Sequence, residues 1–318
     1  MKLTETIKNQ DFFKKIREKF ENNALSNAIL YFCEDEVTSK ATLILTALLL
    51  EYQMFDMFDD KSAEYQKIEK DIDLDVKVYP KNGEKLLVSD SNDIVSECYV
   101  KPTNLPYKIF LLHNFDVSTE EAQNKLLKVL EEPPKNVYFI LSAKSEERVL
   151  PTIKSRCEKT KITPLSQTEI LSICDDKLAC ALGDGYVGKT IALSKNEDLK
   201  NTADFAISIL TRLKSSKDLI LYSKKFIDLK DNLQLVLKVL LLAIEDIIKI
   251  KCESENLLKL KMYSEDLKMV EPEFSVEALC EISKLISKFT EKIEFNANLS
   301  VAIDNLLLKM LEVKYICK

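Results

Sequence analysis

One arginine stands where a side chain could act on phosphate chemistry, at the centre of Ser155-Arg156-Cys157. A guanidinium on an exposed turn can stabilise negative charge that develops on a phosphoryl group, including one bound by a neighbouring subunit. Only four arginines (17, 148, 156 and 212) occur among 46 basic residues, so lysine is the default cation here. Because an ammonium cannot reproduce the planar donor geometry of guanidinium, this scarcity favours a specific role for Arg156. Ser155 and Cys157 are expected to position the turn.

The residues before Arg156 predict the elements that hold it. A helix with a capping box at Ser118 and Glu121 ends at Pro133-Pro134. An apolar strand over 137–141 follows it, and Pro151 then suits the first turn of a short helix. Arg156 should lie near the far end of that short helix. From these residues alone, the preferred interpretation of Arg156 is one more solvated cation beside Lys154, Lys159 and Lys161, and a specific role in phosphate chemistry is the alternative.

Two other chemistries fit these residues less well. Cys157 as a nucleophile would need a base, but the single histidine, His113, ends a different predicted strand. Glu131 and Glu132 could form a catalytic acid pair. However, neighbouring helical positions point about 100° apart, so a charge role at the helix end fits better.

The wider pattern predicts the fold class. Short apolar runs over 28–33, 109–112 and 137–141 alternate with helical periodicity. Such alternation is typical of a parallel sheet covered by helices on both faces. Beyond residue 162 the spacing is helical almost without proline or glycine. We therefore predict an α/β parallel-sheet core, a small all-α domain and an all-α C-terminal domain.

In such a sheet a phosphate-binding loop would follow the first strand. No glycine occurs before Gly83, and three consecutive carboxylates occupy that place. At 4 Å and an effective dielectric constant of 20, each like-charge pair with a phosphate costs about 4 kcal/mol. Lys40 cannot offset three such charges. The sequence therefore predicts a degenerate loop at Cys33, Glu34, Asp35, Glu36, Thr38 and Ser39.

The place for a magnesium site is also degenerate, because His113 and Asn114 follow the strand 109–112 where a carboxylate is needed. The eight cysteines contain no CxxC pair, which favours free thiols in a reducing compartment. We expect no metal and no bound cofactor.

Residues 183–190 nevertheless satisfy the phosphate-loop pattern G-x-x-x-x-G-K-[S/T]. A working loop must leave a buried strand and open a helix. The preceding residues, 170–182, have helical spacing and contain Asp175 and Asp176, unlike a buried strand. A tight turn between two helices is the preferred interpretation, and an active nucleotidase using this loop is the alternative.

Composition narrows the class of protein. A net charge of −6 argues against broad affinity for nucleic acid. The most apolar run, 233–250, is interrupted by Lys238, Glu245 and Asp246, which predicts a core helix and no membrane span. A cytoplasmic location is expected.

These segments together resemble the delta-prime type of clamp-loader subunit of bacterial DNA polymerase III, within the AAA+ superfamily. That family has a strand, an Asn-containing helix ending Leu-Glu-Glu-Pro-Pro, a second strand, Leu-Pro-Thr-Ile and Ser-Arg-Cys. In this sequence they are residues 109–112, 124–134, 137–141, 150–153 and 155–157, with thinner matches at 27–30, 185–188, 296–298 and 304–307.

Differences from the related subunits indicate which subunit type this sequence resembles. The related gamma/tau motor subunits keep a glycine loop and an Asp-Glu pair, and the delta subunit lacks Ser-Arg-Cys. The four zinc-binding cysteines of many relatives are also missing, because Cys98 is the only cysteine between Cys33 and Cys157.

The resemblance implies an AAA+-like core over 1–163, a helical lid over 164–203 and a helical collar over 204–318. It implies no hydrolysis by this chain, which would belong to a DNA-directed DNA polymerase holoenzyme. Arg156 would be an arginine finger in trans within a hetero-oligomer with gamma/tau and delta subunits, which loads a sliding clamp onto primed DNA. A purely structural adaptor is the remaining alternative.

Overall fold

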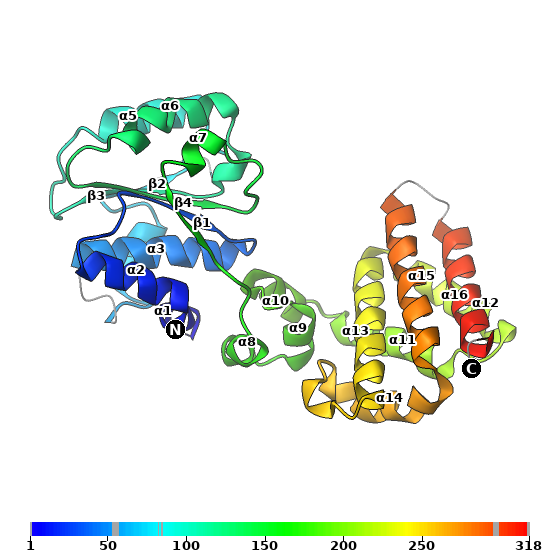
Figure 1. Cartoon of the computed structure of the whole chain (residues 1–318). Helices are drawn as coiled ribbons and strands as arrows, with labels where there is room; N and C mark the ends of the chain where they lie inside the picture. The colour runs from blue at the N-terminus through cyan, green and yellow to red at the C-terminus, as the bar shows by residue number, and fades with distance from the viewer. Residues whose placement is uncertain (1, 53–56, 82, 84, 295–298, 317–318) are drawn as a thin grey trace. The chain divides into compact units, whose positions relative to one another are not determined.

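The computed structural model describes residues 2–52, 57–81, 83, 85–294 and 299–316. The chain divides into two compact units (Figure 1). Unit 1 comprises Met1–Asp175 and Asp184–Lys189, and unit 2 comprises Asp176–Gly183 and Thr190–Lys318. The division into three domains stays a prediction, and the family match at residues 296–298 lies outside the described residues.

Unit 1 is built on a five-stranded sheet with the order β2-β3-β4-β1-β5. Every pairing is parallel, and the register sets Ala28 of β1 opposite Phe139 of β4 and Ile29 opposite Glu158 of β5. The wholly apolar runs of the sequence form strands that are buried on both faces, which confirms the predicted α/β parallel fold. The strands are β1 (Ala28–Phe32), β2 (Val76–Tyr79), β3 (Lys108–Leu112), β4 (Val137–Ala143) and β5 (Glu158–Lys161).

Helices cover both faces of this sheet, as Figure 1 shows. One face packs against α1 (Lys2–Asn9), α2 (Asp11–Glu21), α3 (Glu36–Tyr52) and α4 (Ala63–Glu69). The other face packs against α5 (Val88–Glu97), α6 (Glu120–Glu131) and α7 (Pro151–Lys154). Helix α8 (Gln167–Ile173) completes the unit.

The predicted N-cap residue of α6 is wrong by one position. Thr119, and not Ser118, caps the helix, because its side chain accepts a hydrogen bond from Ala122 N. The Ser118 hydroxyl instead donates to the carbonyl of Phe115, because a 3₁₀ turn (Phe115–Val117) precedes the helix. Ser118 is thus committed to the preceding turn.

Unit 2 is all-helical around one hydrophobic core. Asp246, in the most apolar helix, is fully buried and accepts a 2.7 Å hydrogen bond from Leu260 N, which explains how its charge is tolerated there. Helix α10 (Val187–Ser194) begins in unit 1 and ends in unit 2. The other helices are α9 (Lys177–Leu182), α11 (Leu199–Arg212), α12 (Ser216–Asp228), α13 (Leu233–Lys251), α14 (Ser264–Val270), α15 (Val276–Glu294) and α16 (Leu299–Ile316), with short 3₁₀ turns at Lys230–Asn232, Glu255–Leu257, Lys261–Tyr263 and Glu271–Glu273.

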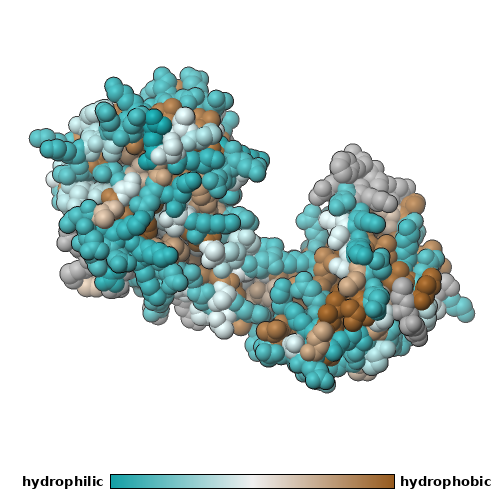
Figure 2. All heavy atoms as spheres, viewed as in Figure 1, coloured by the Kyte–Doolittle hydropathy of each residue, from teal (hydrophilic) through white to brown (hydrophobic). Residues whose placement is uncertain are grey.

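Hydrophobic residues reach the surface of unit 2 (Figure 2). Ile220, Met269 and Ile316 are each more than three-quarters exposed. Over the described part of the chain, no helix combines the length and the apolar character needed to cross a membrane.

One buried carboxyl makes the stability of unit 1 depend on pH. Glu51 is only 6% exposed, and neither carboxyl oxygen has a hydrogen-bond partner among the described residues. Burial, aided by Asp73 and Asp75, raises its pKa to about 8. Folding therefore favours the protonated acid, and stability falls as pH rises from the usual carboxyl range to about 8.

Glu51→Gln is expected to remove this dependence. Its unfolding temperature should exceed that of the wild type at pH 8.5, and the difference should shrink toward pH 5. Thermal scans across this range check the prediction, with the exposed Glu147→Gln as control. Parallel wild-type and Glu51→Gln curves would contradict it.

Candidate functional site

The predicted degenerate loop lies at the carboxyl edge of the sheet, between β1 and α3. Asp35 is 7% exposed, and its Oδ2 accepts hydrogen bonds from Thr38 N (2.9 Å) and Thr38 Oγ1 (2.6 Å). Its Oδ1 accepts a 2.8 Å hydrogen bond from Gly188 N. Gly188 lies in the first turn of α10, where amide groups attract anions. An internal carboxylate thus occupies a position of the kind that phosphate takes at a helix N-terminus.

The two flanking carboxylates are also partnered. Tyr186 donates its hydroxyl to Glu34 Oε2 at 2.7 Å, and this hydrogen bond is the main cause that raises the tyrosine pKa to about 12. Glu36 Oε2 lies 3.1 Å from Lys144 Nζ, and the contact lowers the pKa of Glu36. Each of the three carboxylates therefore has a neutral or cationic partner inside the chain.

The remaining residues of the loop are committed to local structure. Ser39 N donates to the carbonyl of Asp35 at 2.8 Å, and Ser39 is 3% exposed. The Cys33 thiol donates to the same carbonyl, and burial raises its pKa to about 11. Lys40 points elsewhere, because its Nζ lies 3.4 Å from Glu69 Oε1.

The predicted degenerate metal site adjoins this loop. Asn114 contributes to lowering the pKa of Glu36, after Lys144, and burial lowers the pKa of His113 and so favours its neutral form. Asp116 is also committed, since its carboxylate accepts from Lys144 N at 3.0 Å and from Ser145 N at 3.3 Å. Within the described ranges, no cluster of three or more histidine, cysteine or acidic residues could hold a metal ion.

Residues 183–186 join α9 to α10, and residues 187–190 form the start of α10. A helix therefore precedes the pattern where a phosphate loop would need a strand. Helix α9 begins after Asp176, which caps it, and this cap divides the predicted helical run 170–182 into two helices. Lys189 Nζ pairs with Asp184 Oδ2 at 2.8 Å. Gly185 has a φ of +79°, and a Cβ there would lie 2.2 Å from the carbonyl oxygen of Leu165. Close backbone packing accounts for this glycine.

Arg156 lies just after α7 and is anchored to α6. Its Nη2 and Nε donate to Glu131 Oε2 at 2.6 and 3.1 Å, and its Nη1 donates to the carbonyl of Thr152 at 2.9 Å. The side chain remains 27% exposed. Ser155 Oγ also donates to the Thr152 carbonyl, at 3.0 Å. Cys157 is 8% exposed, and burial raises its pKa to about 12, so its thiol stays protonated.

The acidic loop and Arg156 lie at opposite ends of the strands: the loop at the carboxyl ends, and Arg156 at the amino ends. Strands β1 and β5 are parallel neighbours; the acidic loop follows β1, whereas Arg156 precedes β5. Four to five residues of strand at about 3.3 Å each separate the two ends by roughly 13–17 Å. Arg156 therefore does not face its own chain's degenerate loop.

Sequence reasoning missed four partners at these two places: Glu131, Lys144, Tyr186 and Gly188. Lys144 could have been found, because it directly follows β4 at the edge where the loop after β1 also lies. The pairing of Gly188 with Asp35 joins residues 153 positions apart, which no periodicity signals.

A family described as "DNA polymerase III, delta subunit" matches residues 8–166, half of the 318 residues. Among individual proteins, a DNA polymerase III subunit gamma of Buchnera aphidicola is 31% identical over 135 residues. That match covers 42% of this chain and 37% of the gamma subunit. A subunit gamma/tau of Mycobacterium tuberculosis is 35% identical over 69 residues, which cover 22% of this chain and 12% of that protein. This chain thus spans about a third or less of these relatives.

Two solved structures are similar along nearly the whole chain. A DNA polymerase III gamma subunit-related protein of Thermotoga maritima has a TM-score of 0.44 at 18% identity, covering 96% of this chain and 100% of that one. The DNA clamp loader delta protein of Bacillus subtilis has a TM-score of 0.35 at 11% identity, covering 94% and 99%.

Proposed function

This chain belongs to the DNA polymerase III delta subunit family, and we propose that it is a clamp-loader subunit of the delta-prime type, which hydrolyses no ATP. In place of hydrolysis it supplies Arg156 in trans to the ATP site of a neighbouring subunit. The observation that carries this proposal is that Arg156 lies at the amino ends of the strands, whereas the acidic loop of the same chain lies at the carboxyl ends. An arginine in that position can serve phosphate chemistry only outside its own nucleotide position.

The contacts of the acidic loop support the absence of hydrolysis. A triphosphate bound after β1 would have to displace Asp35 from Gly188 N and meet two further carboxylates, Glu34 and Glu36. Lys144 follows β4 and could have met a phosphate, but it is paired with Glu36. The degenerate loop therefore satisfies with its own charges the donors that would otherwise bind nucleotide.

The ion pair between Arg156 and Glu131 is compatible with a role for Arg156 as an arginine finger. A partly exposed ion pair of this kind contributes about 0.2–1 kcal/mol. Stabilising a phosphoryl transition state is worth about 10³- to 10⁵-fold in rate, several times more in free energy. Glu131 can thus hold the guanidinium in place without preventing its transfer to a stronger anionic partner.

The remaining parts of the proposal follow from family membership. The partners would be gamma/tau and delta subunits, acting together on a sliding clamp and primed DNA in the cytoplasm. Exposed apolar residues of unit 2 (Figure 2) suit a collar that associates with other subunits. The core, lid and collar would be residues 1–163, 164–203 and 204–318.

Nucleotide titration tests the inactive site. Isothermal calorimetry with ATP and Mg²⁺ is expected to detect no micromolar binding to this chain, and Lys189→Ala should behave like the wild type. Micromolar affinity that is lost in Lys189→Ala would instead establish residues 183–190 as a working phosphate loop. The proposed role of Arg156 in the ATP site of a neighbouring subunit is tested separately, by the rate of ATP hydrolysis in the assembled complex with and without this side chain.

A further inference from the structure

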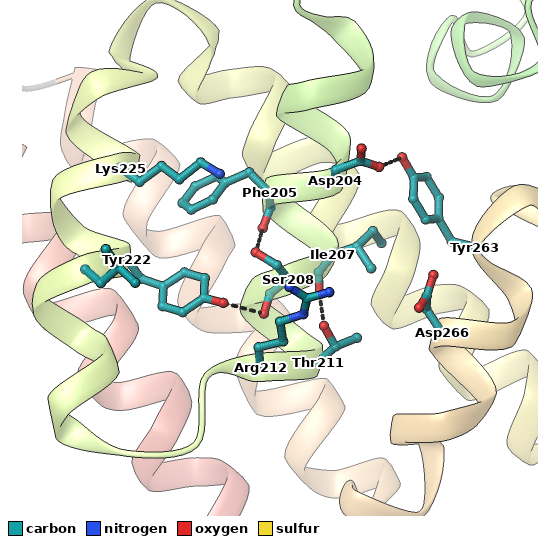
Figure 3. A pocket seen from close by; sticks show the side chains of 11 residues that line it. Asp204, Phe205, Ile207, Ser208, Thr211, Arg212, Tyr222, Lys225, Tyr263 and Asp266 are labelled. Carbon is teal, nitrogen blue, oxygen red and sulfur yellow. Dashed lines mark hydrogen bonds between the residues drawn. The ribbon is translucent and has the colours of Figure 1, made fainter.

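Unit 2 contains a groove of about 500 Å³ that the proposed function does not use (Figure 3). Helix α11 forms its floor, α12 forms one wall, and α14 with the preceding 3₁₀ turn (Lys261–Tyr263) forms the other. Along α11 the lining runs from Asp204 to Arg212, eight residues apart. At 1.5 Å per residue this corresponds to about 12 Å, or roughly two helical turns. The volume lies within the range of ordinary ligand sites.

Hydrogen bonds fix the shape of the groove. The Tyr263 hydroxyl donates to Asp204 Oδ1 at 2.6 Å, and the Tyr222 hydroxyl donates to the carbonyl of Ser208 at 3.3 Å. Tyr222 also stacks on Phe205, with ring centroids 5.9 Å apart. Both walls are thus tied to the floor helix, which makes the groove largely pre-formed.

The lining has four charged side chains, and none of them forms an ion pair among the residues that the structure describes: Asp204, Arg212, Lys225 and Asp266. Asp204 accepts a hydrogen bond from the Tyr263 hydroxyl. Lys225 lies over the Phe205 ring, 5.1 Å from its centroid. Arg212 is also one of only four arginines in the chain, and the proposed function leaves it without a role. Bidentate binding of a carboxylate is the task for which guanidinium is suited and ammonium is not.

The charges are separated across the groove. Lys225 lies on the α12 side and Arg212 at one end of the floor, whereas Asp204 and Asp266 lie toward the α14 side (Figure 3). Phosphodiester chains would meet these carboxylates, so nucleic acid is a poor match. Leu221, 69% exposed, adds an apolar rim on α12. A matching occupant needs an apolar side chain toward α12, an anion for Arg212 and a cation for Asp266.

We propose that this groove binds a short helical segment of a partner protein, about two turns long, that presents an apolar side chain, a carboxylate and a cation in that order across the groove. The carboxylate pairs with Arg212, the cation pairs with Asp266, and the apolar side chain packs against Leu221 and Tyr222. The helix lies along α11, where two walls already exist. The proposal does not depend on Arg156 or on the inactive nucleotide position.

A displayed library of helical 14-residue peptides, selected on the full chain, supplies the probe. Selected sequences should converge on one apolar, one acidic and one basic position, with the acidic position between the other two. Titration of the tightest peptide should show about 10-fold or greater weakening for Arg212→Glu and for Asp266→Lys. Lys224→Glu, an exposed change on α12 that does not line the groove, should bind like the wild type.

A charge exchange makes the test specific. Replacing the basic residue of the peptide with glutamate should weaken its binding to the wild type and restore binding to Asp266→Lys. Circular dichroism should show the same helix content in all variants, since Arg212, Lys224 and Asp266 are exposed. Three outcomes overturn the proposal: equal binding by all variants, self-association lost in Arg212→Glu, or duplex DNA binding lost in Arg212→Glu. The second identifies a second copy as occupant, and the third identifies nucleic acid.

Discussion

Replacing Arg156 with alanine is expected to slow ATP hydrolysis at the neighbouring subunit's site by about 10³- to 10⁵-fold. The guanidinium would stabilise charge on the transferring phosphoryl group, and alanine leaves that charge without a donor. Single-turnover hydrolysis in the complex reconstituted with clamp and primed DNA measures this site directly. Steady-state turnover would also report any other ATP site of the assembly, so it is the less sensitive measurement.

Three further variants separate chemistry from assembly. Arg156→Lys should recover little activity, because an ammonium cannot make the paired contacts of guanidinium. Glu131→Gln should keep most of it, since the exposed ion pair only holds the side chain. Arg17→Ala removes an exposed arginine that pairs with Glu21 on its own helix, and serves as the matched control. If Arg156→Ala assembles and hydrolyses ATP at the wild-type rate, a structural adaptor becomes the better assignment.

Gly185→Ala is expected to destabilise unit 1 by roughly 2–5 kcal/mol. About 1–2 kcal/mol comes from placing a side chain at positive φ, and a further 1–3 kcal/mol from displacing backbone. The second contribution arises because a Cβ would lie 2.2 Å from the carbonyl oxygen of Leu165 and 3.0 Å from its amide nitrogen. Hydrogen exchange of the β1 and β3 amides in increasing urea measures the change.

Gly83→Ala is the matched control for this prediction. Gly83 has nearly the same φ, +77°, but apart from its two chain neighbours nothing among the described residues lies within 4 Å of the position that a Cβ would take. This variant should therefore lose only about 1–2 kcal/mol. Equal losses at the two positions would mean that Gly185 serves backbone conformation alone, and that close packing against Leu165 contributes nothing.

The sequence predicts the strands that are apolar throughout, because burial on both faces leaves no alternation to misread. Strand β1 and residues 109–112 of β3 are of this kind. It does not reveal α5, whose ten residues (VSDSNDIVSE) include six Ser, Asp and Asn and bury only part of one side. The carboxyl ends of the strands can be predicted only in part. The three carboxylates after β1 indicate that phosphate binding is disfavoured, but the residues that pair with these carboxylates depend on tertiary contacts.

Arg156 illustrates the same boundary. Its place after a short helix and before a strand follows from Pro151 and from the strand-like residues that come next. Its anchoring to Glu131 does not, because 25 residues separate the two and their meeting depends on how α6 and α7 pack on one face of the sheet. A motif can therefore identify a reactive group without identifying the residue that restrains it.

The hydrogen bond from Gly188 N to Asp35 has a thermodynamic consequence for the proposed role in an ATP-driven complex. A protein that needs a bound ligand to complete its fold gains stability in proportion to the logarithm of ligand concentration, so its folded population follows cellular energy charge. A chain that carries the required anion covalently has no such linkage. Its unfolding free energy should be the same in ATP-rich and ATP-depleted cells, and it should stay folded whatever the nucleotide state of its proposed neighbours.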